Sequence, residues 1–311
     1  MRAGLPMKHI DIGNGSMNAS EISLGCMRIA HLSDTEASLL INTALEEGIN
    51  FFEHADIYGE GKSEEVFARA VDMRPAIREK FIIQTKCGIR KGYYDFSKDH
   101  IIASVEGSLK RLKTDYVDAL LLHRPDTLME PEEIAEAFTI LHTGGKVKYF
   151  GVSNHNPMQI ELLGKYLRHK LIINQLQLSI MNTGMIDSGL HVNMHVDGSI
   201  DRDGSILEYC PLHDMTIQAW SPFQYGFFEG VFLDNDKFPE LNKTINAIAA
   251  AKGVPNTAIA IAWILRHPAK IQAIAGTTNP QRLRDICKTS NVELSRQEWY
   301  EIYRSAGNVL P

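Results

Sequence analysis

Cysteine is scarce in this chain, and its spacing excludes one class of protein. The four cysteines lie far apart and form no Cys-x-x-Cys pair; they are Cys26, Cys87, Cys210 and Cys287. A small disulfide-stabilised fold needs closer and denser spacing. We therefore predict reduced thiols in a cytosolic protein.

Long apolar runs are also absent. No run of about 18 apolar residues, the length that spans a bilayer, occurs anywhere in the sequence. The segment Met1–Gly15 lacks the apolar stretch of a secretory signal. The sequence thus predicts no membrane partner and a cytoplasmic location.

The chain has no excess of positive charge. Its net charge is -6 and its pI is near 6.1, which argues against a broad surface for nucleic acid or anionic lipid. Hydrophobic residues make up 44% and charged residues 23%, a balance typical of a globular protein with a sizeable core. The 311 residues would suit two average domains, but single barrels reach this size, and we expect one domain over residues 1–311.

Short apolar runs alternate with amphipathic helices along most of the chain. Gly13-Asn14-Gly15 predicts an N-terminal hairpin, because asparagine and glycine tolerate positive φ. About eight strands follow, separated by helical segments. The predicted strands are Ile22–Gly25, Asn50–Glu53, Phe81–Lys86, Tyr116–Leu122, Tyr149–Val152, Leu171–Leu178, Met215–Trp220 and Ile271–Ala275.

This alternation implies parallel strands joined by right-handed crossovers. A closed barrel and an open doubly wound sheet both satisfy it. The barrel is favoured because no Gly-x-Gly-x-x-Gly turn opens any unit and because the number of strands suits closure. We predict an α/β fold, a (β/α)8 TIM barrel whose N-terminal β-hairpin closes the bottom.

Several helical segments and one irregular segment complete the prediction. Ser33-Asp34-Thr35-Glu36 is a capping box that opens a helix. Further helices are expected between Ile206 and Cys210, between Pro239 and His267, and after Pro280. The segment Asn182–Gly204 has no regular period and follows the sixth strand. Long irregular connections are usually functional or disordered, so we expect this one above the site.

Polar side chains end most of the predicted strands, where the catalytic groups of (β/α)8 barrels lie. Glu53 ends the second strand, Lys86 the third, and His123 follows the fourth; Tyr58 comes shortly after Glu53. One such residue alone is usually a solvated or satisfied group, but a whole group of them on one rim predicts a site. The remaining members are Ser153, Asn154, Gln175, Trp220 and Arg282.

The residue types suit one chemistry. A tyrosine hydroxyl titrates near about 10 in water, and a nearby lysine ammonium is expected to lower its pKa. A carboxylate beside the lysine fixes its charge and position. An imidazole can orient a carbonyl oxygen and donate to it as charge develops. Carboxylate, lysine, tyrosine and histidine together form a proton donor for carbonyl reduction.

These residues lie in segments that resemble the aldo-keto reductase superfamily, with the bacterial aldo/keto reductase-type oxidoreductases as its most similar branch. The resemblance spans nearly the whole chain, in family order. The matching segments are Phe51–Glu65 (FFEHADIYGEGKSEE), Ile82–Gly88 (IIQTKCG), Asp118–Asp126 (DALLLHRPD), Lys146–Asn154 (KVKYFGVSN), Asn174–Ser179, Ala219–Phe223 (AWSPF) and Gly276–Arg284 (GTTNPQRLR).

The resemblance implies a role for each catalytic residue. Tyr58 would be the general acid, Lys86 its activator and His123 the residue that orients the substrate carbonyl. Glu53 occupies the position of the acidic residue, which is normally aspartate in the family. A glutamate can still reach Lys86 if the strand end or its rotamer adjusts; Asp56 is a second, less favoured choice.

The resemblance also implies a nicotinamide cofactor. Ser153, Asn154 and Gln175 match residues that bind the carboxamide, and Trp220 matches the aromatic residue that stacks on the ring. Ser221, Gly276, Thr277 and Arg282 complete the expected cofactor set. Many NADP-preferring members have lysine at the position of Gly276, but Arg282 can bind a phosphate with two donors, which favours NADP(H) over NAD(H).

Three functions compete on this evidence. The first is NADPH-dependent reduction of an aldehyde or ketone by a monomer or weak homo-oligomer. The second is a cofactor-binding sensor or scaffold with little turnover, because the family includes potassium-channel β subunits. The third, a metal-dependent hydrolase, would use His191 and His195, which are four residues apart. Without a His-x-His or His-Glu-x-x-His motif we expect no metal site.

The substrate pocket is expected near Met27, Tyr93, Tyr94, Met181, residues 182–204 and Phe223–Phe228.

Overall fold

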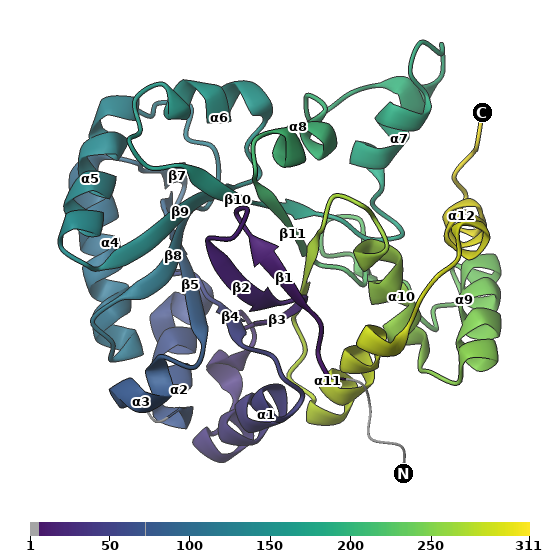
Figure 1. Ribbon diagram of the computed structural model, residues 1–311, viewed down its shortest axis with the longest axis horizontal. Coiled ribbons are helices and arrows are strands. Elements are labelled where there is room, and N and C mark those ends of the chain that lie inside the picture. Colours follow the sequence, from purple (N-terminus) through teal and green to yellow (C-terminus); the bar gives the residue numbers. More distant parts are fainter. Residues whose placement is uncertain (1–5, 72) are drawn as a thin grey trace.

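The computed structural model describes residues 6–71 and 73–311, and a closed barrel of eight parallel strands forms its centre (Figure 1). Each predicted strand is present, and the closed order confirms the (β/α)8 barrel. Around the barrel the strands follow the chain order. They are β3 (Ile22–Gly25), β4 (Phe51–Glu53), β5 (Ile82–Cys87), β8 (Val117–Leu122), β9 (Val147–Ser153), β10 (Leu171–Gln177), β11 (Thr216–Trp220) and β14 (Gln272–Ala275).

The N-terminal hairpin closes one end of the barrel, as predicted. Its strands β1 (His9–Ile12) and β2 (Met17–Ser20) lie within the ring of barrel strands in Figure 1. The backbone N–H of Gly13 donates to Oγ1 of Thr216, the first residue of β11, at 3.1 Å. Gly13 has φ +61°, and a Cβ there would lie 2.6 Å from Ile172. The tip of the hairpin therefore needs glycine to approach the amino end of the strands.

Helices surround the barrel, and several begin at caps that the sequence shows. Ser33 caps the first of them, and the reciprocal bonds of its capping box with Glu36 are present. The described helices are α1 (Asp34–Glu46), α2 (Lys62–Ala70), α3 (Pro75–Arg78), α4 (Lys98–Leu112), α5 (Pro131–Thr143), α6 (Pro157–Gly164), α7 (Gly184–Leu190), α8 (Ile206–Leu212), α9 (Pro239–Lys252), α10 (Asn256–Leu265), α11 (Pro280–Cys287) and α12 (Arg296–Ser305).

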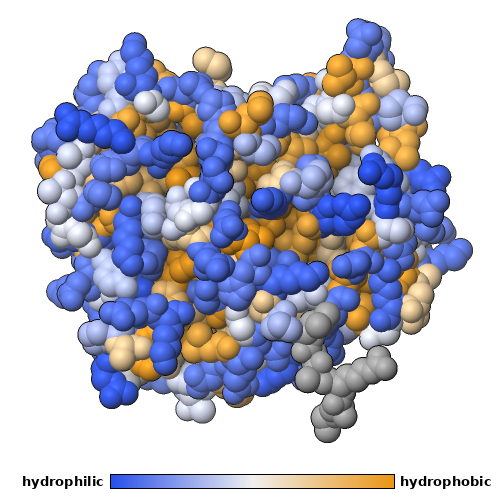
Figure 2. All heavy atoms as spheres, in the orientation of Figure 1, coloured by the Kyte–Doolittle hydropathy of each residue, from blue (hydrophilic) through white to orange (hydrophobic). Residues whose placement is uncertain are grey.

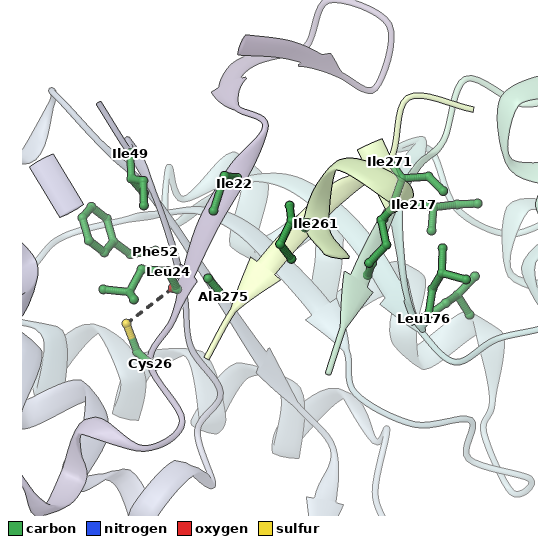
Figure 3. Close-up of a cluster of buried hydrophobic side chains, with 14 of the residues drawn as sticks. Ile22, Leu24, Cys26, Ile49, Phe52, Leu176, Ile217, Ile261, Ile271 and Ala275 are labelled. Carbon is green, nitrogen blue, oxygen red and sulfur yellow. Dashed lines mark hydrogen bonds between the residues drawn. The ribbon is translucent and has the colours of Figure 1, made fainter. Parts of the chain in front are cut away.

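The main core lies between the outer face of the strands and the helices. Figure 3 shows Ile261 of α10 among Ile22, Ile217 and Ala275, which come from three neighbouring strands. All four side chains are fully buried or nearly so. Burying apolar area at roughly 25 cal/mol per Å² makes this layer the main source of stability. It also fixes where each strand ends, and hence where the polar groups that follow the strands lie.

Residues 239–267 form two helices separated by a break. α9 ends at Gly253, whose φ is +65°, and Pro255 precedes α10. A left-handed glycine ends a helix, and proline cannot continue one. The two axes differ by 96°. This break brings the first turn of α10 to the site described below.

The irregular segment 182–204 contains α7 and a 3-10 turn at Asp197–Ser199. α7 is anchored away from the barrel axis, because Oη of Tyr303 in α12 donates to Asp187 at 2.6 Å. Figure 1 shows α7 at the periphery, beyond α8. The expectation that this segment lies over the site is therefore wrong.

The surface in Figure 2, seen from the hairpin side, is mostly polar, with apolar residues in scattered patches between polar ones. All four cysteines are free and buried, which agrees with the predicted thiols. Among the described residues no single helix is long and apolar enough to cross a membrane. In that part of the chain one pair of helices, α9 and α10, passes the test when taken together, with a sharp bend between them.

Candidate active site

A cavity of about 790 Å³ opens at the carboxyl ends of the barrel strands. The residues that end or follow β3, β4, β8, β9, β11 and β14 line it, because parallel strands bring their carboxyl ends to one rim. Every residue of the predicted catalytic and cofactor-binding sets lines this cavity except Lys86, which is fully buried behind its wall. The residues lining it are Glu53, Tyr58, His123, Ser153, Asn154, Gln175, Trp220, Ser221, Gly276, Thr277 and Arg282.

Glu53, Tyr58, Lys86 and His123 form one cluster, which we call the proton-donor cluster. Nζ of Lys86 donates to Oη of Tyr58 at 2.9 Å and to the His54 carbonyl at 2.8 Å, and it is also hydrogen-bonded to Oε1 of Glu53. Oη of Tyr58 donates to the same Glu53 oxygen at 3.0 Å. The His123 ring lies edge-on to Tyr58, with centroids 6.0 Å apart.

A strained turn holds Tyr58 in this position. Tyr58 begins the short turn Tyr58–Gly61, and its N–H donates to the Ala55 carbonyl at 3.1 Å. Gly59 has φ +59°, and a Cβ there would lie 2.5 Å from Cβ of Ala30. Only glycine fits that position, so the turn that presents the phenol depends on it.

The pKa of Tyr58 moves in the direction opposite to the sequence-based expectation. Burial raises the pKa of the Tyr58 hydroxyl well above its ordinary value, and the charge and hydrogen bond of Glu53 raise it further. The sequence-based expectation that Lys86 would lower the pKa of Tyr58 took account of the lysine charge alone and not of Glu53. Because the glutamate is one methylene longer than aspartate, its carboxylate reaches the phenol as well as the ammonium. Tyr58 is thus held in its protonated form.

The other two members are also shifted by burial. Burial lowers the pKa of Lys86, and the Glu53 carboxylate opposes that shift and favours the ammonium. Burial also lowers the pKa of His123 well below its usual range, and the charges of Lys86 and Arg124 add to the effect. His123 is therefore a neutral imidazole near neutral pH, able to donate one N–H to an oxygen in the cavity.

Asp56, the second choice for the acidic member, does not contact the lysine side chain. Its backbone N–H donates to the Lys86 carbonyl at 3.0 Å, whereas the carboxylate on Nζ is that of Glu53. Burial, with the charge of Glu64, raises the pKa of Asp56 to about 6. The structure thus places Glu53, rather than Asp56, in the cluster.

We expect Asp56→Asn to change how stability depends on pH. A carboxyl whose folded pKa is raised to about 6 stabilises the fold fully below its ordinary value of 3.8, and this contribution is lost as pH rises through 6. The variant should gain roughly 1–2 kcal/mol over wild type at pH 7 and much less at pH 4. Urea unfolding at both pH values measures this, with exposed Asp236→Asn as control; an equal effect at both would contradict the assignment.

A chain of buried amides crosses the barrel interior and sets the polarity of Gln175. The Ser20 carbonyl can only accept, so Nε2 of Gln272 must face it, at 2.8 Å. Oε1 of Gln272 then accepts from Nε2 of Gln218 at 2.7 Å, and Oε1 of Gln218 accepts from Nε2 of Gln175 at 3.1 Å. This order leaves Oε1 of Gln175 as the acceptor available to the cavity.

A second set of bonds fixes Asn154. Trp220 Nε1 can only donate, and it donates to Oδ1 of Asn154 at 3.1 Å. Nδ2 of Asn154 then donates to Oγ of Ser153 at 2.8 Å and keeps a second N–H. Together with Gln175, the wall offers one amide donor and one amide acceptor. This pair is complementary to a primary carboxamide, which has one carbonyl and one NH2 group.

Two residues of this wall have left-handed backbone although they are not glycine. Asn154 has φ +58° directly after β9, and Ser221 has φ +52° directly after β11. Asparagine tolerates this conformation, whereas at serine it costs about 1 kcal/mol or more. Both strands therefore turn sharply where their last side chains enter the cavity.

Another part of the cavity lining contains residues that the sequence analysis missed. The break before α10 brings Asn256 and Thr257 into the cavity, and Oγ1 of Thr257 is buried with no protein partner. Gly253 and Pro255 were the signals that could have located this helix start. Arg282, which also lines the cavity, is in the first turn of α11 with its side chain exposed.

Aromatic side chains form the mouth of the cavity. Phe223 and Phe228 line it, as expected, and the Phe228 ring is stacked on Trp220 with centroids 5.9 Å apart. Met27 also lines it. Three residues expected there do not: Tyr93, Tyr94 and Met181 lie outside the lining. The two tyrosines instead form β7, paired with β6 (Ile89–Arg90).

The possible zinc ligands do not come together. Nδ1 of His191 is bonded to the carbonyl of Asp187 at 2.8 Å, and His195 is exposed. Across residues 6–71 and 73–311, no group of three or more histidine, cysteine, aspartate or glutamate side chains could hold a metal ion.

Known proteins are similar to this chain in sequence and in fold. A model of the aldo/keto reductase family matches residues 21–306. Oxidoreductase YcsN of Bacillus subtilis, itself uncharacterized, is 36% identical over 283 residues, covering 87% of this chain and 88% of YcsN. A 6-dehydroglucose reductase of Agrobacterium fabrum is 34% identical over 304 residues, covering 93% of this chain and 95% of that reductase.

Solved structures of similar fold are also aldo-keto reductases. The thermostable aldo-keto reductase Tm1743, determined with the inhibitor epalrestat, has a TM-score of 0.79 and 26% identity, covering 96% of this chain and 100% of its own. The match to the family model covers nearly the whole barrel and contains every residue of the proton-donor cluster. The chain therefore belongs to the aldo/keto reductase family and is an NAD(P)H-dependent oxidoreductase.

Proposed function

We propose that this protein reduces an aldehyde or ketone to an alcohol with NADPH, and that Tyr58 donates the proton. The observation that supports this most is the position of the Tyr58 hydroxyl. It lies in the cavity wall, 2.9 Å from the Lys86 ammonium and bonded to Glu53. No other described hydroxyl in that wall has both a cation and a carboxylate as partners.

Three residues would each have a separate role in the reduction. His123, as a neutral imidazole, donates its N–H to the substrate oxygen and orients the carbonyl. Tyr58 delivers its proton to that oxygen as the carbonyl carbon is reduced, and the Lys86 ammonium stabilises the phenolate that remains. A proton from solvent then restores the phenol. When bound, the reduced nicotinamide supplies the hydride.

The amide pair of Asn154 and Gln175 would hold the nicotinamide carboxamide, and Trp220 would lie against its ring. The Trp220–Asn154 bond at 3.1 Å keeps the indole in a fixed orientation. Gly276, Thr277 and Arg282 also line the cavity, and the Arg282 guanidinium suits an adenosine 2′-phosphate. This arrangement favours NADPH over NADH.

One observation favours the sensor alternative. The Glu53 carboxylate accepts a hydrogen bond from Tyr58 and raises its pKa. A phenol held too firmly in its protonated form would slow proton delivery. A protein with the same cavity would then bind the cofactor with little turnover.

A two-step assay separates these functions. Tryptophan fluorescence is followed on adding NADPH or NADH, and absorbance at the nicotinamide band on adding 4-nitrobenzaldehyde. Quenching by NADPH followed by aldehyde-dependent oxidation supports the reductase. Quenching without oxidation across an aldehyde panel, including sugar aldehydes because one relative is a 6-dehydroglucose reductase, supports the sensor. No quenching with either nucleotide would contradict both.

We expect Glu53→Asp to leave kcat equal to or higher than that of wild type. The shorter side chain keeps a carboxylate for Lys86 and draws back from Tyr58, so the pKa of the phenol falls. The basic limb of the kcat–pH profile should move to lower pH, because a general acid loses activity above its pKa. A collapse of kcat would contradict the role given to Glu53.

A further inference from the structure

Arg124 is a half-buried cation in the cavity wall that the reaction described above does not use. It directly follows His123 at the end of β8 and lines the cavity. Its guanidinium lies 5.8 Å from the ring centre of Trp220 and 6.0 Å from that of Phe227. The cation is therefore held at the aromatic mouth, on the side of the proton-donor cluster.

No ion pair satisfies this guanidinium within residues 6–71 and 73–311. The cavity lining has two carboxylates, and both have other partners. Glu53 is bonded to Lys86, and Asp234 accepts from Nδ2 of Asn256 at 3.0 and 3.1 Å. A half-buried charge without a counterion costs stability, so the site is suited to an incoming anion.

The position of Arg124 limits which anion can reach it. Its charge lowers the pKa of both Tyr58 and His123, so it lies within electrostatic range of the reacting carbonyl. Arg282 belongs to another element, α11, after β14. The adenosine 2′-phosphate assigned to Arg282 and the cation of Arg124 therefore lie at the ends of different strands, β14 and β8, and we assign the anion at Arg124 to the second substrate.

We propose that Arg124 binds a carboxylate of the carbonyl substrate, so that the enzyme prefers oxo acids over neutral carbonyl compounds. A planar guanidinium binds a carboxylate with two parallel hydrogen bonds. The Trp220 and Phe227 rings beside the guanidinium replace part of its hydration and strengthen that contact. The inference rests on the proposed reductase function and names its substrate class.

A matched substrate pair tests the proposal. 4-Formylbenzoate and its methyl ester share one reactive aldehyde and differ in charge at the far end of the ring. Wild type should show kcat/KM about 10- to 100-fold higher for the acid, mainly through KM. Arg124→Met should remove this preference by raising KM for the acid. Arg28→Met, a change in an exposed arginine of the cavity lining that has no part in the proposed cofactor site, should keep it.

Each contrary outcome has a separate meaning. Equal kcat/KM for acid and ester in wild type would overturn the proposal while leaving the reductase function in place. The same holds if Arg28→Met, rather than Arg124→Met, removes the preference, or if Arg124→Met only weakens NADPH binding in a fluorescence titration. Oxidation of neither aldehyde would contradict the reductase function, and this inference with it.

Discussion

Tyr58→Phe is expected to lower kcat for aldehyde reduction by about 10²- to 10⁴-fold, the usual contribution of a positioned general acid. The variant keeps the ring, which packs edge-on to His123, and loses only the hydroxyl bonded to Lys86 and Glu53. Affinity for NADPH should change little, because the amide pair at Asn154 and Gln175 is untouched. Stopped-flow absorbance and fluorescence titration measure the two quantities separately.

Tyr94→Phe is the matched control. Tyr94 is exposed and lies outside the cavity. The Tyr94→Phe variant also lacks one phenolic hydroxyl, and it should reduce aldehydes at the wild-type rate. If Tyr58→Phe retained most of its turnover, the proton would have to come from another group, and His123 would be the first candidate. If both variants lost activity alike, the effect would not be one of proton donation.

The second large effect is on stability. Lys86→Met should lower the free energy of unfolding by about 3–5 kcal/mol at pH 7, the usual cost of breaking a buried ion pair. Lys86 is fully buried and Glu53 is 3% exposed, so the variant leaves a carboxylate in the interior without its counterion. Turnover should fall as well, because the phenolate loses its ammonium.

Two further variants separate charge from packing. Lys86→Met combined with Glu53→Leu removes both charges and should recover most of the lost stability, while turnover stays low. Lys98→Met breaks an exposed pair with Glu136 and should cost less than about 1 kcal/mol. Urea unfolding of the four proteins gives the values. A double variant no more stable than Lys86→Met would show that packing, rather than the unpaired carboxylate, explains the loss.

The barrel and its rim follow from the sequence because one physical rule links them. Short, mostly apolar runs of three to seven residues mark the strands, and parallel pairing brings every strand end to the same rim. Glu53, His123 and Ser153 could therefore be placed together although they lie far apart in the chain. Lys86 shows the limit of this rule, because its strand continues to Cys87 and its side chain lies behind the cavity wall.

What the sequence did not predict depends on contacts between distant residues. The raised pKa of Tyr58 follows from the reach of Glu53, which is a matter of rotamer and distance. The amide chain through Gln218 and Gln272 is invisible in a strand pattern, since those residues are simply polar positions in buried strands. Asn182–Gly204 was misplaced because a lack of periodicity does not say where a segment packs.

The central claim, that the proton-donor cluster works with glutamate in place of aspartate, is tested most directly by one single-turnover experiment. Protein in excess over NADPH is mixed with 4-nitrobenzaldehyde, quenched at intervals, and the alcohol is quantified. The account predicts one alcohol formed for each NADPH consumed, and only background alcohol with Tyr58→Phe. Bound NADPH without alcohol, even after long incubation, would contradict the claim and leave a cofactor-binding protein whose glutamate holds the phenol protonated.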